Sequence, residues 1–345
     1  MNDALNFAPL IERLCLRQDL SAEDAQTFFT EVVHGRVAES VLAAVLVALK
    51  AKGETAAEIT GAANALRNSA LPFSTGNMQV ADTCGTGGDG MHTLNVSTGA
   101  ALVAAAGGLP VVKHGNRSVS SRCGSADVLE VLGIPADVTP IAARTLLDDL
   151  GICFLFAPTM HPGIRHASGV RKSLGVRTIF NLLGPLANPA KPAYQVLGAG
   201  LPQWLTPIAN TLNMLGTTAA LIVHGGGLDE LALHDETQAI LLSGGAMTDL
   251  VIAPEDAGLV RAPVQALRGG GPVENADARE CALQGAGARA FHDAIALNAG
   301  ALFWIANMAP SLRAGVAEAD RILRAGLPAQ LLSNYRKACD ALKDG

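Results

Sequence analysis

The segment that most constrains the fold is residues 80–117, which reads as strand, glycine loop, helix, strand and basic loop in succession. An apolar run leads into the glycine cluster Gly85-Thr-Gly-Gly-Asp-Gly90, and a polar turn beginning at Asn95 opens a helix of small residues. A second apolar run, residues 110–112, ends in Lys113-His-Gly-Asn-Arg117. In a β-α-β unit both loops lie at the carboxyl edge of parallel strands. The sequence therefore predicts an anion site of phosphate size at this edge.

The pattern of short apolar runs alternating with helical segments continues downstream. Buried strands are predicted at residues 80–83, 110–113, 152–157, 194–198, 219–224 and 238–242, followed by helices at 275–285, 288–308 and 329–342. Thr139-Pro140 and Thr206-Pro207 each predict a helix start, with an N-cap before a first-turn proline. This alternation favours an α/β fold with a mostly parallel central sheet and helices on both faces.

Residues 1–70 read as helices only, with Ser21 and Thr55 as N-caps. The polar, basic segment 160–189 interrupts the strand pattern, and we expect it to return to this helical part of the chain. The predicted small helical domain therefore comprises residues 1–72 and about 162–190. The predicted α/β domain comprises residues 73–161 and 191–345.

Composition excludes several classes of protein. The chain has 345 residues, of which 49% are hydrophobic, so a large core is available. A net charge of −6 argues against a nucleic-acid partner. Six cysteines without a CxxC pair indicate reduced thiols rather than a disulfide framework or a zinc site. No signal-peptide core or bilayer-length apolar run is visible, so we expect a cytoplasmic protein without a membrane partner.

The glycine cluster matches GxGxxG, but the dinucleotide-binding motif also needs an acidic residue about 20 positions later. Lys113-His114 stands there instead, and the chain contains no GxxxxGK motif of a P-loop. A tight turn with close backbone packing is the structural alternative. The following helix starts with three polar residues, Asn95, Ser97 and Thr98. Their side chains either donate to a phosphate or cap the helix.

Two further loops carry candidate binding groups. Asp229 and Glu230 follow a glycine run after a predicted strand, and adjacent carboxylates suit Mg²⁺ that also binds substrate phosphates. An exposed acidic turn is the alternative. Arg171, in the segment 170–189, is suited to clamp a carboxylate, or else forms a surface ion pair. The basic run that begins at Lys113 is either part of this site or a solvated face.

Five motifs occur in order: GTGGD at 85–89, NVST at 95–98, KHGNR at 113–117, VRKSLGVRTIFNLLGPLANP at 170–189 and GLDE at 227–230. Together they resemble the anthranilate phosphoribosyltransferase family over almost the whole chain. The resemblance implies a fold of the nucleoside phosphorylase/phosphoribosyltransferase type, paired as a homodimer through its helical part. It also implies transfer of the 5-phosphoribosyl group from phosphoribosyl pyrophosphate (PRPP) to the amine of anthranilate. The products would be N-(5-phosphoribosyl)anthranilate and pyrophosphate, in the second step of the tryptophan branch.

The resemblance also implies residue roles. It assigns PRPP binding to Gly85, Thr86, Gly87, Gly88, Asp89, Thr93, Asn95, Ser97, Thr98, Lys113 and Ser125. It assigns anthranilate binding to Gly85, His114, Asn116, His161, Arg171 and Gly184. It assigns two Mg²⁺ ions to Ser97, Asp229 and Glu230. No residue is expected to act as a general acid or base, and Lys113 with the magnesium-binding groups is expected to stabilise the transition state.

Two alternatives remain open at the level of sequence. A pyrimidine nucleoside phosphorylase resembles this fold and uses a glycine loop, but it would consume phosphate rather than PRPP and would differ in the segment 170–181. A non-catalytic relative that binds nucleic acid would show a basic cleft and degraded loops, whereas this chain is acidic and its loops are complete.

Overall fold

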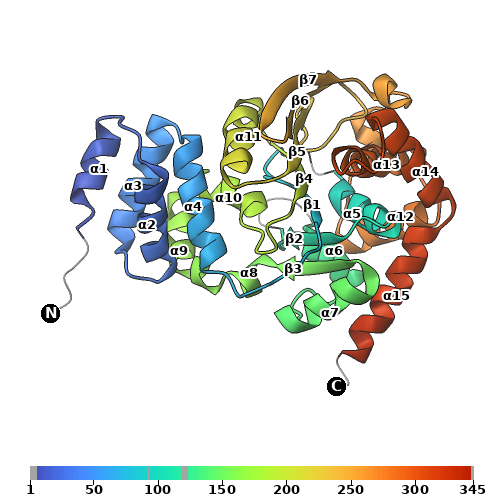
Figure 1. The fold of residues 1–345 in the computed structure, drawn as a ribbon, viewed down its shortest axis with the longest axis horizontal. Helices are drawn as coiled ribbons and strands as arrows, with labels where there is room; N and C mark the ends of the chain where they lie inside the picture. Colours follow the sequence, from blue (N-terminus) through green and yellow to red (C-terminus); the bar gives the residue numbers. More distant parts are fainter. Residues whose placement is uncertain (1–5, 92, 119–122, 343–345) are drawn as a thin grey trace.

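The computed structural model describes residues 6–91, 93–118 and 123–342, which form a small helical lobe beside a larger lobe built on one sheet (Figure 1). The helical lobe contains α1 (Ala8–Cys15), α2 (Ala22–Val33), α3 (Glu39–Lys52), α4 (Ala56–Asn68), α9 (Arg165–Leu174) and α10 (Phe180–Leu186). The larger lobe contains α5 (Val96–Ala106), α6 (Ser125–Val131), α7 (Pro140–Leu150), α8 (Ala157–Met160), α11 (Leu205–Met214), α12 (Pro272–Leu283), α13 (Arg289–Ile305), α14 (Leu312–Arg324) and α15 (Leu327–Ala341). The predicted fold class is confirmed.

The sheet has seven strands in the order β3-β2-β1-β4-β5-β6-β7. They are β1 (Ala81–Gly85), β2 (Val111–Gly115), β3 (Ile152–Phe156), β4 (Tyr194–Gly198), β5 (Ala219–Gly225), β6 (Thr237–Ser243) and β7 (Ala246–Ile252). The first five strands pair in parallel, and β6 and β7 add an antiparallel hairpin. The chain moves outward from β1 to β3 and then returns to β4 on the other side of β1. This reversal creates a switch point between β1 and β4, where α/β sheets bind ligands.

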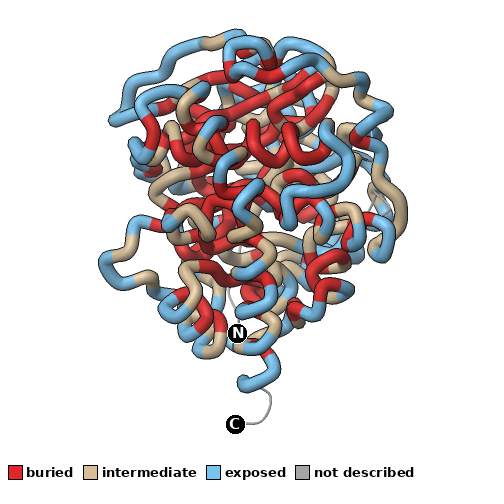
Figure 2. The backbone as a smooth tube through the Cα atoms, turned by 90° about the vertical axis from the view of Figure 1, so that its right-hand side faces the viewer, coloured by how far each residue is buried: buried red, intermediate tan, exposed pale blue. Residues whose placement is uncertain are grey.

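Each inner strand buries both faces, with alternate residues in two different cores. In β5, Leu221 and Val223 belong to the core under α5 and α13, whereas Ala220 and Ile222 belong to the core that continues into the helical lobe. Figure 2 shows buried backbone running through the middle of the larger lobe, with exposed segments around it. Two-sided burial explains why these strands read as apolar runs in the sequence.

The helical lobe follows local signals closely. Ser21 accepts a hydrogen bond from the Asp24 backbone N–H, and Thr55 and Glu58 form a reciprocal capping box. The segment after β3 returns to this lobe, because α9 packs against α2 and α3 while α10 packs against α4. Phe180 of α10 meets the ring of Phe29 edge-on, with centroids 5.6 Å apart.

Three elements differ from the prediction. Strand β7 was not predicted because most of its residues are exposed, and helix α14 was also missed. Thr139 caps α7 as expected, but the N-cap prediction for Thr206 is wrong. Helix α11 starts at Leu205, because a 3₁₀ turn over Pro202–Trp204 runs directly into it and Leu205 is buried in the core. No helix in the described residues is long and apolar enough to cross a membrane.

Candidate active site

The floor of the candidate site is a pair of glycines on neighbouring strands at the switch point. Gly85 at the end of β1 pairs in register with Gly198 at the end of β4. The loop after β5 folds back over both: a Cβ on Gly85 would lie 1.9 Å from Asp229 Oδ2, and a Cβ on Gly198 would lie 1.6 Å from the Asp229 carbonyl oxygen. Only glycine permits this approach, so the floor fixes where the acidic loop lies.

Asp229 joins the acidic loop to the glycine loop. Its Oδ2 accepts a hydrogen bond from the Gly87 N–H at 2.7 Å. Glu230 reaches the start of α5, where its Oε1 accepts from the Ser97 N–H at 3.2 Å. Lys113, at the end of β2, donates to the Ser97 hydroxyl at 3.3 Å and to the Thr83 carbonyl. The structure therefore brings together the glycine loop, the α5 N-terminus, Lys113 and the acid pair.

The electrostatics of this cluster favour a bound cation. Burial, reinforced by the neighbouring Asp89 carboxylate, raises the pKa of Asp229 to about 7. Burial and the charge of Asp229 raise the pKa of Glu230 to about 8, against the opposing effect of Lys113. Ionising both carboxylates is costly unless positive charge is added nearby.

The donor set fits magnesium shared with a substrate. Mg²⁺ prefers oxygen ligands and is commonly held by one or two carboxylates together with water and phosphate oxygens. Asp229 and Glu230 provide such carboxylates. Within the described residues no group of three His, Cys, Asp or Glu side chains is arranged to hold a metal. Phosphate oxygens and water would therefore have to complete the coordination sphere.

The start of α5 is braced by the C-terminal part of the chain, a support that sequence reasoning missed. Asn95 donates from Nδ2 to the Cys123 carbonyl at 2.9 Å and accepts from Asn275 Nδ2 at 3.1 Å. Arg279, fully buried, donates to the Asn95 carbonyl. Thr93 forms a bridge with Arg268. The Asn95 side chain is thus engaged with the protein, and its helix has no side-chain cap.

Three other residues assigned to PRPP differ in what their side chains contact. Thr86 donates from its N–H to the Gly198 carbonyl and accepts at Oγ1 from the Gly200 N–H. Thr98 is 1% exposed, and its hydroxyl has no hydrogen-bond partner in the described part of the chain. Ser125 donates from Oγ to the Asn116 carbonyl at 3.3 Å, which ties the start of α6 to the loop after β2.

Three of the residues assigned to anthranilate, His114, His161 and Gly184, are neighbours in the structure. His114 bonds the Gly184 carbonyl through Nδ1 at 3.2 Å, and its ring lies edge-on to that of His161 with centroids 5.1 Å apart. Burial, with a contribution from His161, lowers the pKa of His114 to about 3, and burial lowers the pKa of His161 to about 4. Both rings are therefore neutral near pH 7, and they line the site without adding charge.

Arg171, also assigned to anthranilate, lies in the last turn of α9. Its guanidinium lies over the Phe180 ring, 5.1 Å from the centroid, and partial burial lowers its pKa. The alternative of a surface ion pair fails, because no carboxylate contacts Arg171 among the residues that the structure describes. Arg117 behaves differently: it pairs with Glu130 and Asp127, so this end of the basic run is a solvated face.

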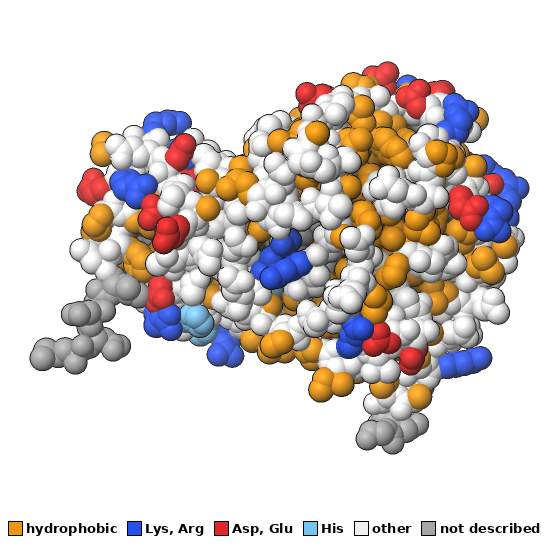
Figure 3. Space-filling view, in the orientation of Figure 1, with side chains coloured by type: hydrophobic (Ala, Val, Ile, Leu, Met, Phe, Trp, Pro, Cys, Tyr) orange, Lys and Arg blue, Asp and Glu red, His pale blue; other side chains and the backbone are white. Residues whose placement is uncertain are grey.

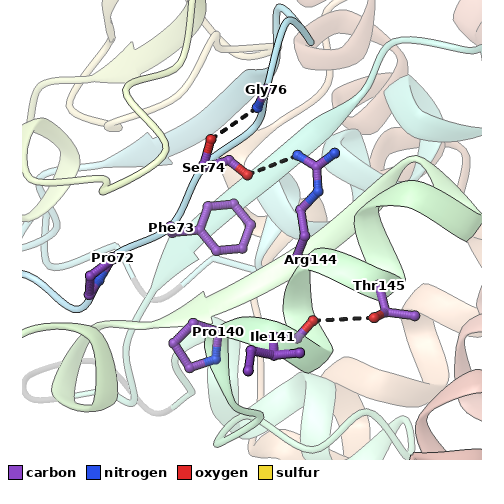
Figure 4. Close-up of a pocket in the computed structure, with 8 residues that line it drawn as sticks. All are labelled: Pro72, Phe73, Ser74, Gly76, Pro140, Ile141, Arg144 and Thr145. Atoms are coloured by element: carbon purple, nitrogen blue, oxygen red, sulfur yellow. Dashed lines mark hydrogen bonds between the residues drawn. The ribbon is translucent and has the colours of Figure 1, made fainter.

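A surface cavity lies apart from the residues of the candidate site. Figure 3 shows a notch between the helical lobe and the larger lobe, and a small group of Lys or Arg side chains near the middle of the same face. A cavity of about 490 Å³ lies between residues 72–76 and the start of α7, lined by Phe73, Ile141 and Arg144 among others (Figure 4). Arg144 is paired with Asp148 there. None of the predicted site residues lines this cavity.

Comparison with known proteins identifies the class first. The helical bundle domain of a glycosyl transferase family matches residues 8–70, and the a/b domain of the same family matches residues 77–329. These two matches cover the helical lobe and most of the sheet lobe, so the class is that of two-domain glycosyl transferases.

Individual relatives narrow the class. The anthranilate phosphoribosyltransferase of Sorangium cellulosum is 54% identical over 94% of this chain and 94% of its own. The crystal structure of the enzyme from Thermus thermophilus superimposes with a TM-score of 0.91 at 44% identity, covering 96% of this chain and 99% of that one. The Saccharomyces cerevisiae enzyme in complex with PRPP and Mg has a TM-score of 0.87 at 25% identity, covering 96% and 97%. The chain belongs to the anthranilate phosphoribosyltransferase family.

Proposed function

We propose that the chain transfers the 5-phosphoribosyl group of PRPP to the amine of anthranilate at the edge formed by β1, β2, β4 and β5. One observation carries this proposal. Asp229 contacts the glycine loop through Gly87, and Glu230 contacts the start of α5 through Ser97. The three segments expected to hold pyrophosphate and magnesium are therefore in direct contact, although they lie far apart in the sequence.

We infer the following residue roles, which this geometry supports. Displacement at an anomeric carbon builds negative charge on the departing pyrophosphate while the ribose gains positive charge. The backbone N–H groups of Gly88 and Asp89 and the ammonium of Lys113 would face that negative charge. When bound, Mg²⁺ supplies further neutralisation of the leaving group. Arg171 orients the anthranilate carboxylate, and the neutral His114 offers a polar edge to the ring. The aromatic amine is unprotonated near neutral pH, so it needs positioning rather than a strong base.

The test follows the fluorescence of anthranilate after addition of PRPP and Mg²⁺, with adenine and orotate as control acceptors. We expect loss of fluorescence that requires all three components, and no turnover with either control. Turnover of a pyrimidine nucleoside with inorganic phosphate, without reaction of anthranilate, would instead support the phosphorylase alternative.

Several finer features belong to the same proposal. The domain division at residues 1–72 and 162–190 against 73–161 and 191–345 is supported by the packing of α9 and α10 on α2–α4. Two Mg²⁺ ions, a role in tryptophan biosynthesis and a cytoplasmic location follow the family resemblance. Homodimerisation through the helical lobe is supported by its exposed Leu16 and Val47 side chains, 68% and 46% accessible. Light scattering coupled to gel filtration measures the oligomeric state.

A further inference from the structure

Arg177 lies in the turn between α9 and α10, and its guanidinium is bound to the glycine loop. Nη1 donates to the Gly88 carbonyl and Nη2 to the Gly87 carbonyl, each at 3.1 Å. No carboxylate pairs with Arg177 among the residues that the structure describes. Its charge and its planar fork are therefore directed at two consecutive backbone carbonyls.

These two contacts fix the orientation of two peptide groups. A peptide unit is planar, and its C=O and N–H point in opposite directions. Holding the carbonyls of Gly87 and Gly88 toward Arg177 turns the N–H groups of Gly88 and Asp89 away from it. Neither of these N–H groups has an acceptor within the described residues. Gly87 and Gly88 have left-handed φ angles of +69° and +76°, and successive N–H groups in such a turn form a concave anion site.

Within the loop itself, only one long hydrogen bond among the described residues holds this orientation, from the Thr86 hydroxyl to the Gly87 carbonyl at 3.4 Å. Glycine populates both signs of φ with little preference, so a peptide group between two glycines can flip and present its carbonyl to an anion. A side chain on Gly88 would be strained at its φ of +76° and would displace the guanidinium, because its Cβ would lie 2.1 Å from Arg177 Nη1. The guanidinium fork thus supplies a constraint that the loop sequence lacks.

We propose that Arg177 is a positioning residue that aims the Gly88 and Asp89 N–H groups at the pyrophosphate of PRPP. The role assigned to the anion rests on the proposed function. Arg177 lies six residues beyond Arg171 in the segment between β3 and β4. The segment that is expected to bind anthranilate therefore also orients the glycine loop that is expected to bind PRPP.

The test compares Arg177→Lys and Arg177→Ala with wild type, and uses Arg165→Lys on the exposed surface of α9 as the control. Lysine keeps the charge but cannot bridge two carbonyls as the guanidinium does. We expect both Arg177 variants to raise the KM for PRPP about ten- to thirtyfold, the loss typical of charged hydrogen bonds. The KM for anthranilate should change less than threefold, and Arg165→Lys should change neither.

Hydrogen–deuterium exchange on the free proteins gives a second readout that requires no turnover. Exchange at Thr86 and Gly87, whose N–H groups are bonded to Gly198 and Asp229, should rise about tenfold in Arg177→Lys, while exchange in β1 stays at the wild-type rate. Unchanged exchange in the loop, an unchanged KM for PRPP in Arg177→Lys, or an equal rise in both KM values would each overturn the proposal. An inactive wild type would count against the proposed function, whereas the exchange result would still decide whether Arg177 orders the loop.

Discussion

Replacing Gly198 with alanine tests whether the acidic loop must lie where the glycine floor places it. The new Cβ would lie 1.6 Å from the Asp229 carbonyl oxygen and 2.2 Å from its carbonyl carbon. Both are backbone atoms, so no side-chain rotation relieves the overlap. No hydrogen-bonding or charged group is removed, which separates the effect of position from the effect of chemistry.

The size of the effect follows from the overlap. Ordinary contact begins at 3.4 Å, so the loop carrying Asp229 and Glu230 must move by roughly 1.8 Å, or β4 must move by a similar distance. Overpacking of this kind costs about 1–3 kcal/mol of stability. A displacement of about 1 Å in a positioned group costs about 100-fold in rate. We therefore expect kcat/KM to fall at least 100-fold while the protein stays folded.

The assay measures anthranilate fluorescence at varied PRPP and Mg²⁺, alongside thermal unfolding. Gly169→Ala in α9 is the matched control, because the nearest atom to its Cβ would be Glu39 Oε1 at 3.5 Å. That control should retain full activity and gain about 0.5–1 kcal/mol of stability. Wild-type kcat/KM and magnesium dependence in Gly198→Ala would refute the argument that the floor sets the position of the acidic loop.

Three other changes address separate groups. Arg171→Ala should raise the KM for anthranilate by about tenfold or more and leave the KM for PRPP nearly unchanged. Steady-state kinetics with each substrate varied in turn measures both KM values, and equal effects on the two would contradict the assignment of Arg171. Asp229→Asn combined with Glu230→Gln should shift the magnesium titration of activity to higher concentration, and an unshifted titration would remove both residues from the metal site. The folded-state pKa of His161, about 4, lies below the usual value of 6.5, so its contribution to stability is present above pH 6.5 and is lost as pH falls toward 4. Unfolding free energies from pH 7 to 4 should therefore fall less steeply in His161→Gln than in wild type, and parallel slopes would rule out His161 as a source of the acid sensitivity.

Sequence patterns predict the convergence of the loops because strand and helix alternate in residues 80–225. Such alternation makes the strands parallel, and parallel strands end at one edge. Gly85, Lys113 and Asp229 could therefore be assigned to one rim without coordinates. Strand β7 gave no comparable signal, because a strand with one exposed face after a two-glycine turn lacks an apolar run.

Contacts between distant segments could not be predicted in the same way. Arg279 and Asn275 brace Asn95 across about 180 positions of sequence, and neither lies in a motif with a stated chemical role. Asn298, on α13, accepts from the Leu231 N–H and so holds the chain just after Glu230. These supports depend on how α12 and α13 pack behind the sheet, and residue spacing along the chain carries no information about that packing.

The returning segment between β3 and β4 explains why residues assigned to PRPP and residues assigned to anthranilate adjoin. The chain must cross from one edge of the sheet to the switch point beside β1, and it does so through α9 and α10 in the helical lobe. The same crossing places Arg171 over Phe180, Arg177 on the glycine-loop carbonyls and the Gly184 carbonyl on His114. A rotation of the helical lobe would therefore move the acceptor residues and the orientation of the phosphate loop together. Positive coupling between the two proposed sites is the expected result of this linkage: PRPP binding, by fixing the loop, should favour anthranilate binding at Arg171, and anthranilate should favour PRPP by the same factor.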